Sequence, residues 1–425
     1  MRVLIVSENV SMKMGGESSL PHYYGKLLEQ RGVEVWLACH ERVREEVLAQ
    51  FPGIGNRLRF IENSRIQRWL LRSSSLLPYR LGDLVVGQLI HYSTQWRLRR
   101  IALELAKRKQ IDIVLEPSPI TPKGLSFMYG LGVPVVIGPM CGGMEFPAAF
   151  RHLDGPLTRV LVRTGRAVSA LANRFVPGKL QADVLLVANA LTEQALPRGI
   201  KGRVIRLFES GVDLEIWRAP VAPRPPDREV RFVFSGRFVD WKGIQYLIPA
   251  FEQAAARDPT CVLELIGGGG EFEREVQQLA AQPVISKRIR FHGWVARERA
   301  AEILRDADVF VMPSLRECGG TAILEAMALG KPVIATRWGG PADYVDDRCG
   351  ILVPPDSVAG FVAGLADAIV RLTQSSELRS RLGLGGLQRV KEDYLAWDAK
   401  ADRVLTVLNE VLLKRDTDSI AHVQR

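Results

Sequence analysis

The segment that decides the fold reads VFVMPSLRECGGTAILEAMALGKPVIAT and covers residues 309–336. It predicts a buried strand at Val309–Pro313, a glycine-containing turn, a helix from Thr321 and a return strand at Pro332–Thr336. Glycines let a phosphate approach backbone N–H groups closely. A helix that begins near Thr321 directs its positive end at the same place. The segment is therefore typical of an anion-binding turn in a parallel sheet.

Two carboxylates flank this turn. Glu317 precedes the glycines, and Glu325 lies about one turn into the helix, where its side chain leans back toward the turn. This spacing suits hydroxyl groups on either side of a diphosphate, as in a nucleotide sugar. The structural alternative is a glycine-rich helix cap with two exposed acids, and the spacing alone does not separate the two. The helix and return strand that follow favour the ligand site.

A second basic segment begins at the predicted strand Val230–Ser235. Arg237 follows this strand, and Lys242 comes five residues later. A guanidinium and an ammonium near a strand end can neutralise a leaving diphosphate. If the pair stood alone, a basic solvated turn would be the better interpretation.

Together these segments resemble the GT-B glycosyltransferases, specifically the retaining enzymes of glycosyltransferase family 4. Glu317 and Glu325 fit the E-x7-E pattern of that family, and Gly330–Ala335 matches its usual run. The resemblance implies that Glu317 lies by the donor sugar and that Glu325 hydrogen-bonds the nucleotide ribose. It also implies that Arg237 and Lys242 bind the phosphates, so we expect Glu317, Arg237 and Lys242 to be catalytic.

Other positions are expected to bind the donor. They are Gly15, Gly16, Gly236, Gly267, Trp294, Cys318, Gly319, Gly320, Thr321 and Glu325. The chain departs from the family at Cys318–Gly320, where the family often has Gly-Phe-Gly. His292 stands alone at a strand end, so we interpret it as structural rather than catalytic. We expect no metal site, because no DxD-type carboxylate cluster is placed for one.

The rest of the chain alternates between apolar strands and helices, which predicts an α/β protein with two Rossmann-like, doubly wound domains. The other expected strands are Val3–Ser7, Val33–Ala38, Ile111–Leu115, Val133–Gly138, Val184–Val187, Val262–Ile266 and Ile289–His292. The proline-rich segment 218–229 interrupts this rhythm. The resemblance implies the GT-B arrangement, with a deep cleft between the two domains.

Three parts of the chain are predicted. Residues 1–206 form an acceptor-binding domain and residues 207–395 a nucleotide-sugar-binding domain. Residues 396–425 form a helix that packs back across the domains and a polar tail. The five cysteines include no CxxC pair, so neither a disulfide framework nor a zinc site is expected. The N-terminus resembles a buried strand rather than a secretory signal, which favours the cytoplasm.

The charge is uneven along the 425 residues. Residues 1–206 contain 29 Lys and Arg against 16 Asp and Glu, a net charge of +13, whereas the remainder contains 28 against 31 and carries −3. Two segments, 57–80 and 159–179, combine arginines with apolar residues at helical spacing. They predict docking at an anionic membrane surface, peripheral at its inner face. The alternatives are apolar faces packed on the core and a solvated basic surface. Nucleic acid is disfavoured, because no recognition motif accompanies the charge.

The expected function is that of a retaining glycosyltransferase. It would move a hexosyl-type residue from a UDP- or GDP-sugar, without another cofactor, to a glycan or lipid-linked acceptor in cell-surface polysaccharide or glycolipid synthesis. Two alternatives are a GT-B-fold nucleotide-sugar epimerase and a catalytically silent subunit that binds the nucleotide sugar. The E-x7-E run argues against the first, and the intact Glu317, Arg237, Lys242 and Glu325 argue against the second. A dinucleotide-binding oxidoreductase is least favoured, because no GxGxxG follows the first strand of either domain.

Overall fold

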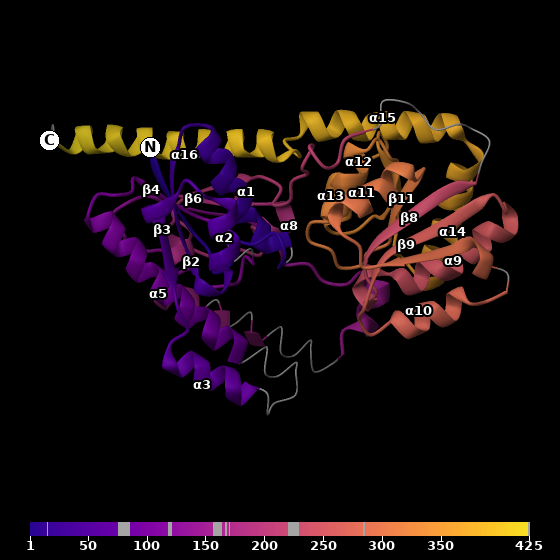
Figure 1. Cartoon of the computed structure of the whole chain (residues 1–425), viewed down its shortest axis with the longest axis horizontal. Helices are drawn as coiled ribbons and strands as arrows, with labels where there is room; N and C mark the ends of the chain where they lie inside the picture. The colour runs from indigo at the N-terminus through magenta and orange to yellow at the C-terminus, as the bar shows by residue number, and fades with distance from the viewer. Residues whose placement is uncertain are drawn as a thin grey trace. The chain divides into compact units, whose positions relative to one another are not determined.

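The computed structural model describes residues 1–14, 16–74, 86–117, 121–155, 164–165, 168–169, 171–219, 229–283 and 285–423. The chain divides into two compact units. The first contains Met1–Gly143, Val160–Glu209 and Lys400–Arg425, and the second contains Met144–Arg159 and Ser210–Ala399. Each unit has its own parallel sheet (Figure 1).

The first unit is built on a seven-stranded sheet with the order β3-β2-β1-β4-β5-β6-β7. All of its strand pairs are parallel. The central strands are buried on both faces, as expected where helices cover a parallel sheet. The strands are β1 Arg2–Val6, β2 Glu34–His40, β3 Leu58–Ile61, β4 Ile113–Glu116, β5 Val135–Met140, β6 Val184–Val187 and β7 Arg203–Arg206.

Helices of several lengths connect these strands. They are α1 Gly16–Gln30, α2 Arg44–Gln50, α3 Arg65–Ser74, α5 Gln88–Lys107, α7 Gly178–Gln181 and α8 Ala190–Gln194. The long helix α5 repeats apolar residues at helical spacing, and Leu98, Ala102 and Leu105 pack against the strands in one core cluster.

The second unit is built on a six-stranded parallel sheet with the order β10-β9-β8-β11-β12-β13. Its strands are β8 Val230–Arg237, β9 Cys261–Gly268, β10 Ile289–Gly293, β11 Val309–Met312, β12 Val333–Thr336 and β13 Gly350–Val353. The strand order reverses between β8 and β11. In open α/β sheets, ligands bind at such a reversal, beyond the carboxyl ends of the strands.

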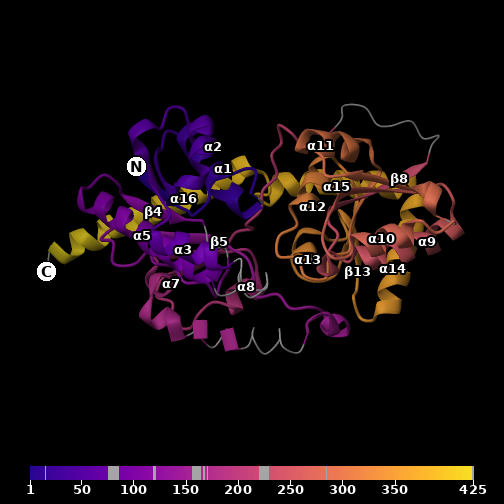
Figure 2. The same cartoon turned by 60° about the horizontal axis from the view of Figure 1, so that its bottom comes forward.

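Helices cover both faces of the second sheet. Figures 1 and 2 show α9, α10 and α14 on one face and α11, α12 and α15 on the other. The helices are α9 Ile244–Arg257, α10 Glu273–Ala280, α11 Arg297–Asp306, α12 Thr321–Ala328, α13 Gly340–Tyr344, α14 Val358–Gln374 and α15 Ser376–Glu392.

Residues 144–155 contribute to the core of the second unit. The ring of Phe150 is fully buried and lies edge-on to Tyr246 and Phe361, with ring centroids 5.2 and 5.7 Å away. Phe146 belongs to the same core cluster. The sequence did not predict that this segment packs in the second unit, because along the chain it lies between two strands of the first sheet.

The last helix, α16 Trp397–Val423, contributes its first residues to the second unit and the rest, from Lys400, to the first. Within the first unit, Arg31 pairs with Asp402 and Arg203 with Glu410. The Lys400 ammonium is buried and donates a hydrogen bond to the carbonyl of Phe208. These contacts attach the helix to the first unit over several turns.

The ten strands expected from the sequence are present, with ends shifted by a few residues. Three further strands, β3, β7 and β13, were not expected. One prediction is wrong: segment 57–80 is not helical throughout, because Leu58–Ile61 forms β3 and the helix begins only at Arg65. Most of the proline-rich segment 218–229 lies outside the described residues, as do residues 75–80 of segment 57–80 and residues 159–163, 166, 167 and 170 of segment 159–179.

Candidate nucleotide-sugar site

The candidate site lies where the second sheet reverses its strand order. Gly236 and Arg237 end β8, and the turn that contains Glu317 follows β11. Because β8 and β11 are adjacent and parallel, their carboxyl ends meet at one edge of the sheet. The two segments expected to bind the donor are therefore brought together.

Lys242 and Glu317 form an ion pair at this edge. Lys242 ends a short 3₁₀ helix, Asp240–Lys242, directly after β8. The two side chains are 19% and 17% exposed, so the pair is mostly shielded but still reachable from solvent. An ammonium and a carboxylate in this position can exchange their mutual contact for contacts with a bound anion and its hydroxyl groups.

Backbone hydrogen bonds hold the two loops against each other. The carbonyl of Trp241 accepts hydrogen bonds from the amides of Leu315 and Arg316, at 2.8 and 3.3 Å. The pairing of Lys242 with Glu317 therefore rests on fixed main chain rather than on the two side chains alone.

Two glycines permit close approach of backbone segments at this edge of the sheet. Gly243 has a φ of +70°, and a Cβ atom there would lie 2.0 Å from the carbonyl oxygen of Pro313. Gly267 has a φ of +106°, and its Cβ atom would lie 2.1 Å from the carbonyl oxygen of Gly236. No side chain fits at either position, so glycine is required by the packing of backbone on backbone.

The turn before α12 leaves the start of this helix available. Gly320 has a φ of +94° and provides no side-chain cap, and Cys318 before it is half-buried and forms no disulfide with a described residue. The first N–H groups of a helix have no partner within it and favour an anion. The Gly340 amide donates to the Glu317 carbonyl at 2.9 Å, which fixes the turn from behind.

Glu325 lies one turn into α12. Burial of its carboxyl group raises the pKa to about 7, and the charge of Arg297 on α11 acts in the opposite direction. A carboxyl group with a raised pKa at the reversal point of a sheet is a reasonable partner for hydroxyl groups. Thr321, at the start of the helix, donates a hydrogen bond to the Ser210 hydroxyl at 3.2 Å.

Trp294 lies beside the glycine-rich end of β9. Its indole is largely exposed, and its Nε1 atom lies 3.7 Å from where a Cβ atom of Gly269 would be. The Gly269 amide donates to Glu273 Oε2 at 2.9 Å, which anchors this turn. An exposed aromatic ring beside a bare backbone offers a flat surface for a planar ligand such as a nucleotide base.

Comparison with known proteins agrees with this geometry. Residues 229–375 match the family model described as glycosyl transferases group 1. The D-inositol 3-phosphate glycosyltransferase of Xylanimonas cellulosilytica is 30% identical over 297 residues, which are 63% of this chain and 69% of that protein. The chain belongs to the group 1 glycosyl transferases.

A second family relative is the lipopolysaccharide core biosynthesis glycosyltransferase of Rhizobium meliloti. It is 38% identical over 152 residues, covering 36% of this chain and 42% of that protein. The chain spans 54% of the D-inositol 3-phosphate glycosyltransferase of Corynebacterium glutamicum and 62% of that of Saccharomonospora viridis.

Solved structures establish the GT-B fold of this family member. HepE from Anabaena, crystallised in complex with UDP, superposes with a TM-score of 0.65 at 15% identity, over 96% of this chain and 100% of that one. Sucrose-phosphate synthase from Thermosynechococcus elongatus gives 0.63 at 20% identity, over 97% and 99%. The fold class expected from the sequence, with two Rossmann-like domains, is confirmed.

The structure gathers most of the expected donor-binding residues of this glycosyl transferase at one edge of the second sheet. Gly16 does not lie at this edge, because it begins α1 in the first unit. Gly15 lies outside the described residues. His292 Nε2 lies 3.1 Å from Glu264 Oε2, a carboxylate buried in the middle of β9, which agrees with a structural role.

Some residues that shape the site were not singled out from the sequence. Gly340 was visible only as part of the Gly339-Gly340 pair, and Arg297 had no signal, because its charge acts on Glu325 from a helix that β11 separates from α12 along the chain. Within the ranges described, no cluster of His, Cys, Asp or Glu is placed to hold a metal ion. None of the helices in those ranges is both long and apolar enough to cross a bilayer.

Proposed function

We propose that this chain is a retaining glycosyltransferase of family 4. It transfers a hexosyl-type residue from a nucleotide diphosphate sugar to a glycan or lipid-linked acceptor, in cell-surface polysaccharide or glycolipid synthesis. The observation that carries the proposal is the Lys242–Glu317 pair, which lies between β8 and β11 in front of a helix that begins with no side-chain cap.

In this mechanism, the site stabilises the charge that grows on the leaving diphosphate. Arg237, Lys242 and the first amides of α12 supply the positive charge and the hydrogen-bond donors. When the donor binds, Lys242 turns from Glu317 to the phosphates, and Glu317 is released to hold the sugar. The acceptor hydroxyl attacks from the face on which the diphosphate leaves, so the anomeric configuration is retained.

The nucleotide is held by groups that fit its parts. The Glu325 carboxylate accepts hydrogen bonds from the ribose hydroxyls, and Trp294 covers the base. We favour a UDP-sugar over a GDP-sugar, because HepE has been crystallised with UDP and with UDP-glucose. The protein itself supplies the positive charges at the diphosphate, so the proposal includes no metal.

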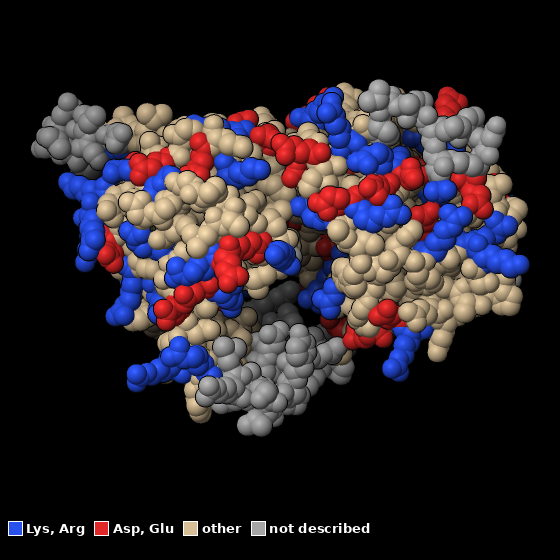
Figure 3. Space-filling model, in the orientation of Figure 1, with Lys and Arg blue, Asp and Glu red and all other residues tan. Residues whose placement is uncertain are grey.

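The first unit is proposed to receive the acceptor at an anionic membrane surface. On α3, Ile66 and Trp69 are 71% and 65% exposed and alternate with the exposed Arg65 and Arg68. Figure 3 shows basic side chains over the region of α3 and α5. Apolar residues flanked by arginines match the chemistry of a bilayer interface. Near residues 159–179, Val168 and Leu171 are also exposed beside Arg174.

Product analysis tests the proposed reaction. The purified chain is incubated with a UDP-hexose labelled in the sugar, first alone and then with a bacterial glycolipid extract. We expect label in the extract with the anomeric configuration of the donor, as read by NMR. Conversion of the sugar without acceptor would indicate an epimerase, and binding without turnover would indicate a silent subunit.

Co-sedimentation tests the membrane surface. Binding to vesicles is expected to rise with anionic-lipid content and to fall with salt. The double variant Ile66→Ser/Trp69→Ser should lose most of it. A matched control is Leu384→Ser, at a 67% exposed leucine on α15 in the second unit. Equal loss in both variants, or binding that ignores lipid charge and salt, would remove the membrane from the proposal.

A further inference from the structure

A hollow in the second unit, separate from the candidate nucleotide-sugar site, carries charge that the proposed reaction does not use. Its volume is about 350 Å³, and its lining includes Arg337, Arg371, Arg381 and one acid, Asp347. The apolar part of the lining comes from β13 and from the first turns of α15. None of these residues belongs to the candidate nucleotide-sugar site.

The three arginines come from three different elements. Arg337 follows β12, Arg371 lies in the last turn of α14 and Arg381 lies in the second turn of α15. Arg337 is well separated in the sequence from the other two, and the fold brings all three around one hollow. A guanidinium presents five N–H donors in a planar fork that fits phosphate oxygens.

These guanidinium groups lack the counter-charges found elsewhere in the same unit. Arg257 pairs with Asp367, Arg290 with Glu229 and Arg299 with Glu302. Within the described part of the chain, Arg371 and Arg381 have no hydrogen-bond or ion-pair partner, and Arg337 reaches only the Leu352 carbonyl, at 3.4 Å. No ion pair of the described residues joins Asp347 to them. Like charges around a hollow repel one another, and a bound anion relieves this repulsion.

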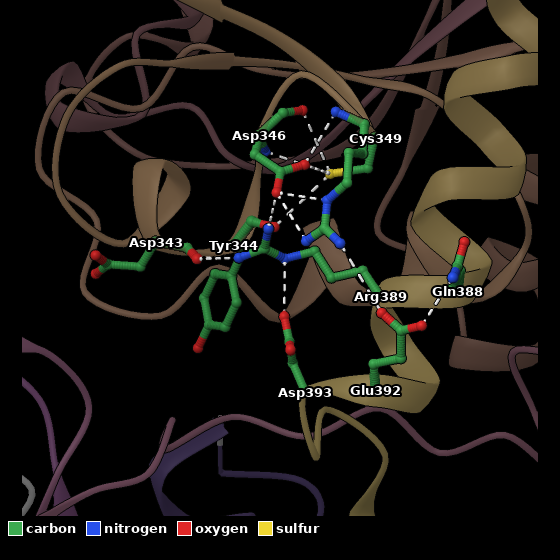
Figure 4. A network of polar contacts seen from close by, with 9 residues as sticks. Asp343, Tyr344, Asp346, Cys349, Gln388, Arg389, Glu392 and Asp393 are labelled. Atoms are coloured by element: carbon green, nitrogen blue, oxygen red, sulfur yellow. Dashed lines mark hydrogen bonds and ion pairs between the residues drawn. The ribbon is translucent and has the colours of Figure 1, made fainter.

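The wall of the hollow is braced by the network in Figure 4. Asp346 pairs with Arg348 and with Arg389, and Arg389 also donates to the Asp343 carbonyl at 2.9 Å. Burial would raise the pKa of Asp346, but the hydrogen bond from Arg348 and the charge of Arg389 hold it below its usual value.

This network fixes the turn that leads into β13. The Asp346 carbonyl accepts a hydrogen bond from the Gly350 amide at 2.9 Å, and Asp347 and Gly350 both line the hollow. A Cβ atom at Gly350 would lie 2.3 Å from the Val333 carbonyl oxygen, so the strand entrance is tightly packed. One wall of the hollow is therefore held in place before any ligand arrives.

We propose that this hollow is a second anion site, which binds a phosphorylated small molecule with two or more negative charges. The volume is within the range of small-ligand pockets, roughly 300–1,000 Å³. The net charge of the lining side chains favours a diphosphate or bisphosphate over a monocarboxylate. The same chemistry occurs in free sugar phosphates and in lipid headgroups, so the experiment has an arm for each.

Calorimetric titration of the full chain with inorganic diphosphate tests the site. Because the nucleotide-sugar site also attracts diphosphates, the background is Lys242→Ala. In this background we expect one equivalent of diphosphate to bind still. The added pair Arg371→Gln/Arg381→Gln should weaken that binding by about a hundredfold or more, since each lost charge-assisted hydrogen bond corresponds to roughly ten- to a hundredfold.

The matched control is Arg257→Gln/Arg299→Gln, which removes the same charge from arginines that have acidic partners and lie outside the hollow. It should bind diphosphate as the Lys242→Ala background does. Equal weakening in both pairs, or no binding in the Lys242→Ala background up to millimolar diphosphate, would overturn the proposal.

An experiment with vesicles distinguishes a soluble phosphorylated ligand from a lipid headgroup. Neutral vesicles with and without phosphatidic acid are sedimented with the same variants. Binding of free diphosphate that depends on Arg371 and Arg381, with no such dependence for vesicles, indicates a soluble ligand. The reverse pattern indicates a lipid headgroup. Since both arginines lack partners among the described residues, the variant should fold as stably as the wild type, which thermal unfolding checks.

Discussion

The two parallel sheets reverse their strand order in the same way, but their carboxyl edges carry different chemistry. In the second unit the reversal lies between β8 and β11, and in the first between β1 and β4. The edge in the second unit consists of bare backbone at glycines, the accessible Lys242–Glu317 pair and the start of α12. The edge in the first unit consists of polar side chains that contact one another.

Several polar groups at the first edge have partners within the protein, although Oε1 of Glu116 has none among the described residues. Glu8, after β1, contacts His91 and Arg42, each at 2.6 Å. Burial would raise the pKa of Glu8, but His91 and Arg42 hold it below its usual value. Glu116, at the end of β4, is fully buried and accepts a hydrogen bond from the Ser126 hydroxyl. Burial raises the pKa of Glu116 to about 8.

We propose that the nucleotide binds at the second edge, and this difference supports that proposal. A ligand at the first edge would have to break the half-buried contacts of Glu8 and the buried hydrogen bond of Glu116, at a cost in free energy for each group left unpaired. At the second edge, a diphosphate would meet backbone amides, and the one Lys242–Glu317 contact that it breaks would be replaced by contacts with the ligand. The same topology therefore provides a ready anion site in one unit and a closed polar cluster in the other.

The largest expected effect is on turnover at the second edge. Lys242→Ala and Glu317→Ala should each lower kcat by about 10²–10³-fold, because each removes a group that acts on the diphosphate or the sugar. The measurement is initial rate at saturating UDP-sugar. The exposed pair Arg257 and Asp367 provides the control, and Arg257→Ala should keep the wild-type rate. Near wild-type turnover in Lys242→Ala would contradict the role of the second edge.

The next effect is on stability and compares a glycine of each unit. Gly267→Ala should lower the free energy of unfolding by roughly 2–4 kcal/mol, since its Cβ atom would meet the Gly236 carbonyl at a positive φ. Gly16→Ala should change it by less than about 0.5 kcal/mol, because no atom of the described residues beyond its chain neighbours lies within 4 Å of its Cβ position. Denaturant unfolding measures both. If Gly267→Ala lowered the free energy of unfolding only slightly, the carboxyl edge of the second sheet would tolerate a side chain at this position.

A smaller effect concerns pH. Glu325 has a pKa raised to about 7, so its carboxylate fraction grows as the pH rises from 6 to 8. If the carboxylate holds the ribose, affinity for UDP-glucose should rise about tenfold over this range. Glu325→Gln should bind more weakly at pH 8 and show no such rise. A rise of equal size in the variant would assign the pH dependence to another group.

Ionisation of Glu325 also affects stability. A rise in pH should strengthen the binding of UDP-glucose but lower the free energy of unfolding. Because the folded-state pKa lies above the ordinary value of 4.5, the native state keeps its proton longer than the unfolded state between pH 4.5 and 7. On this account stability falls as the pH rises through that window, and Glu325→Gln should flatten the decline.

The smallest effect compares two buried serines. Ser126→Ala should lower the free energy of unfolding by about 1 kcal/mol, because Glu116 loses its donor. Ser314→Ala should be nearly neutral for folding, since its buried hydroxyl has no partner within the described residues. Thermal and denaturant unfolding distinguish them. If the two variants were equal, the hydrogen bond at the first edge would not contribute to stability.

The strands that the sequence did not reveal share a physical cause. β3, β7 and β13 are all at the edge of a sheet. An edge strand such as β7, which reads RVIR, contains charged residues because the edge of the sheet meets solvent, so it forms no continuous apolar run. The buried central strands, such as β6 with VLLV, form continuous apolar runs and were predicted within a few residues.

The candidate site was more predictable from the sequence than the edge strands were, because its parts lie in short segments of sequence. Glu317, the glycines and Glu325 follow one another around a single turn, and Arg237 and Lys242 follow a single strand. The three arginines around the hollow of the second unit were not predictable. Arg337, Arg371 and Arg381 meet only through the packing of α14 and α15 on β13. Contacts between distant elements leave no local pattern in the sequence.

Hydrogen exchange of the full chain with and without UDP tests the central claim most directly. We predict that UDP protects amides in three segments of the second unit, 236–243, 267–270 and 317–325, and leaves the first edge around Glu8 and Glu116 unchanged. In Lys242→Ala, the protection should require a higher UDP concentration. Protection centred on the first edge, or no protection in those three segments at saturating UDP, would contradict the account.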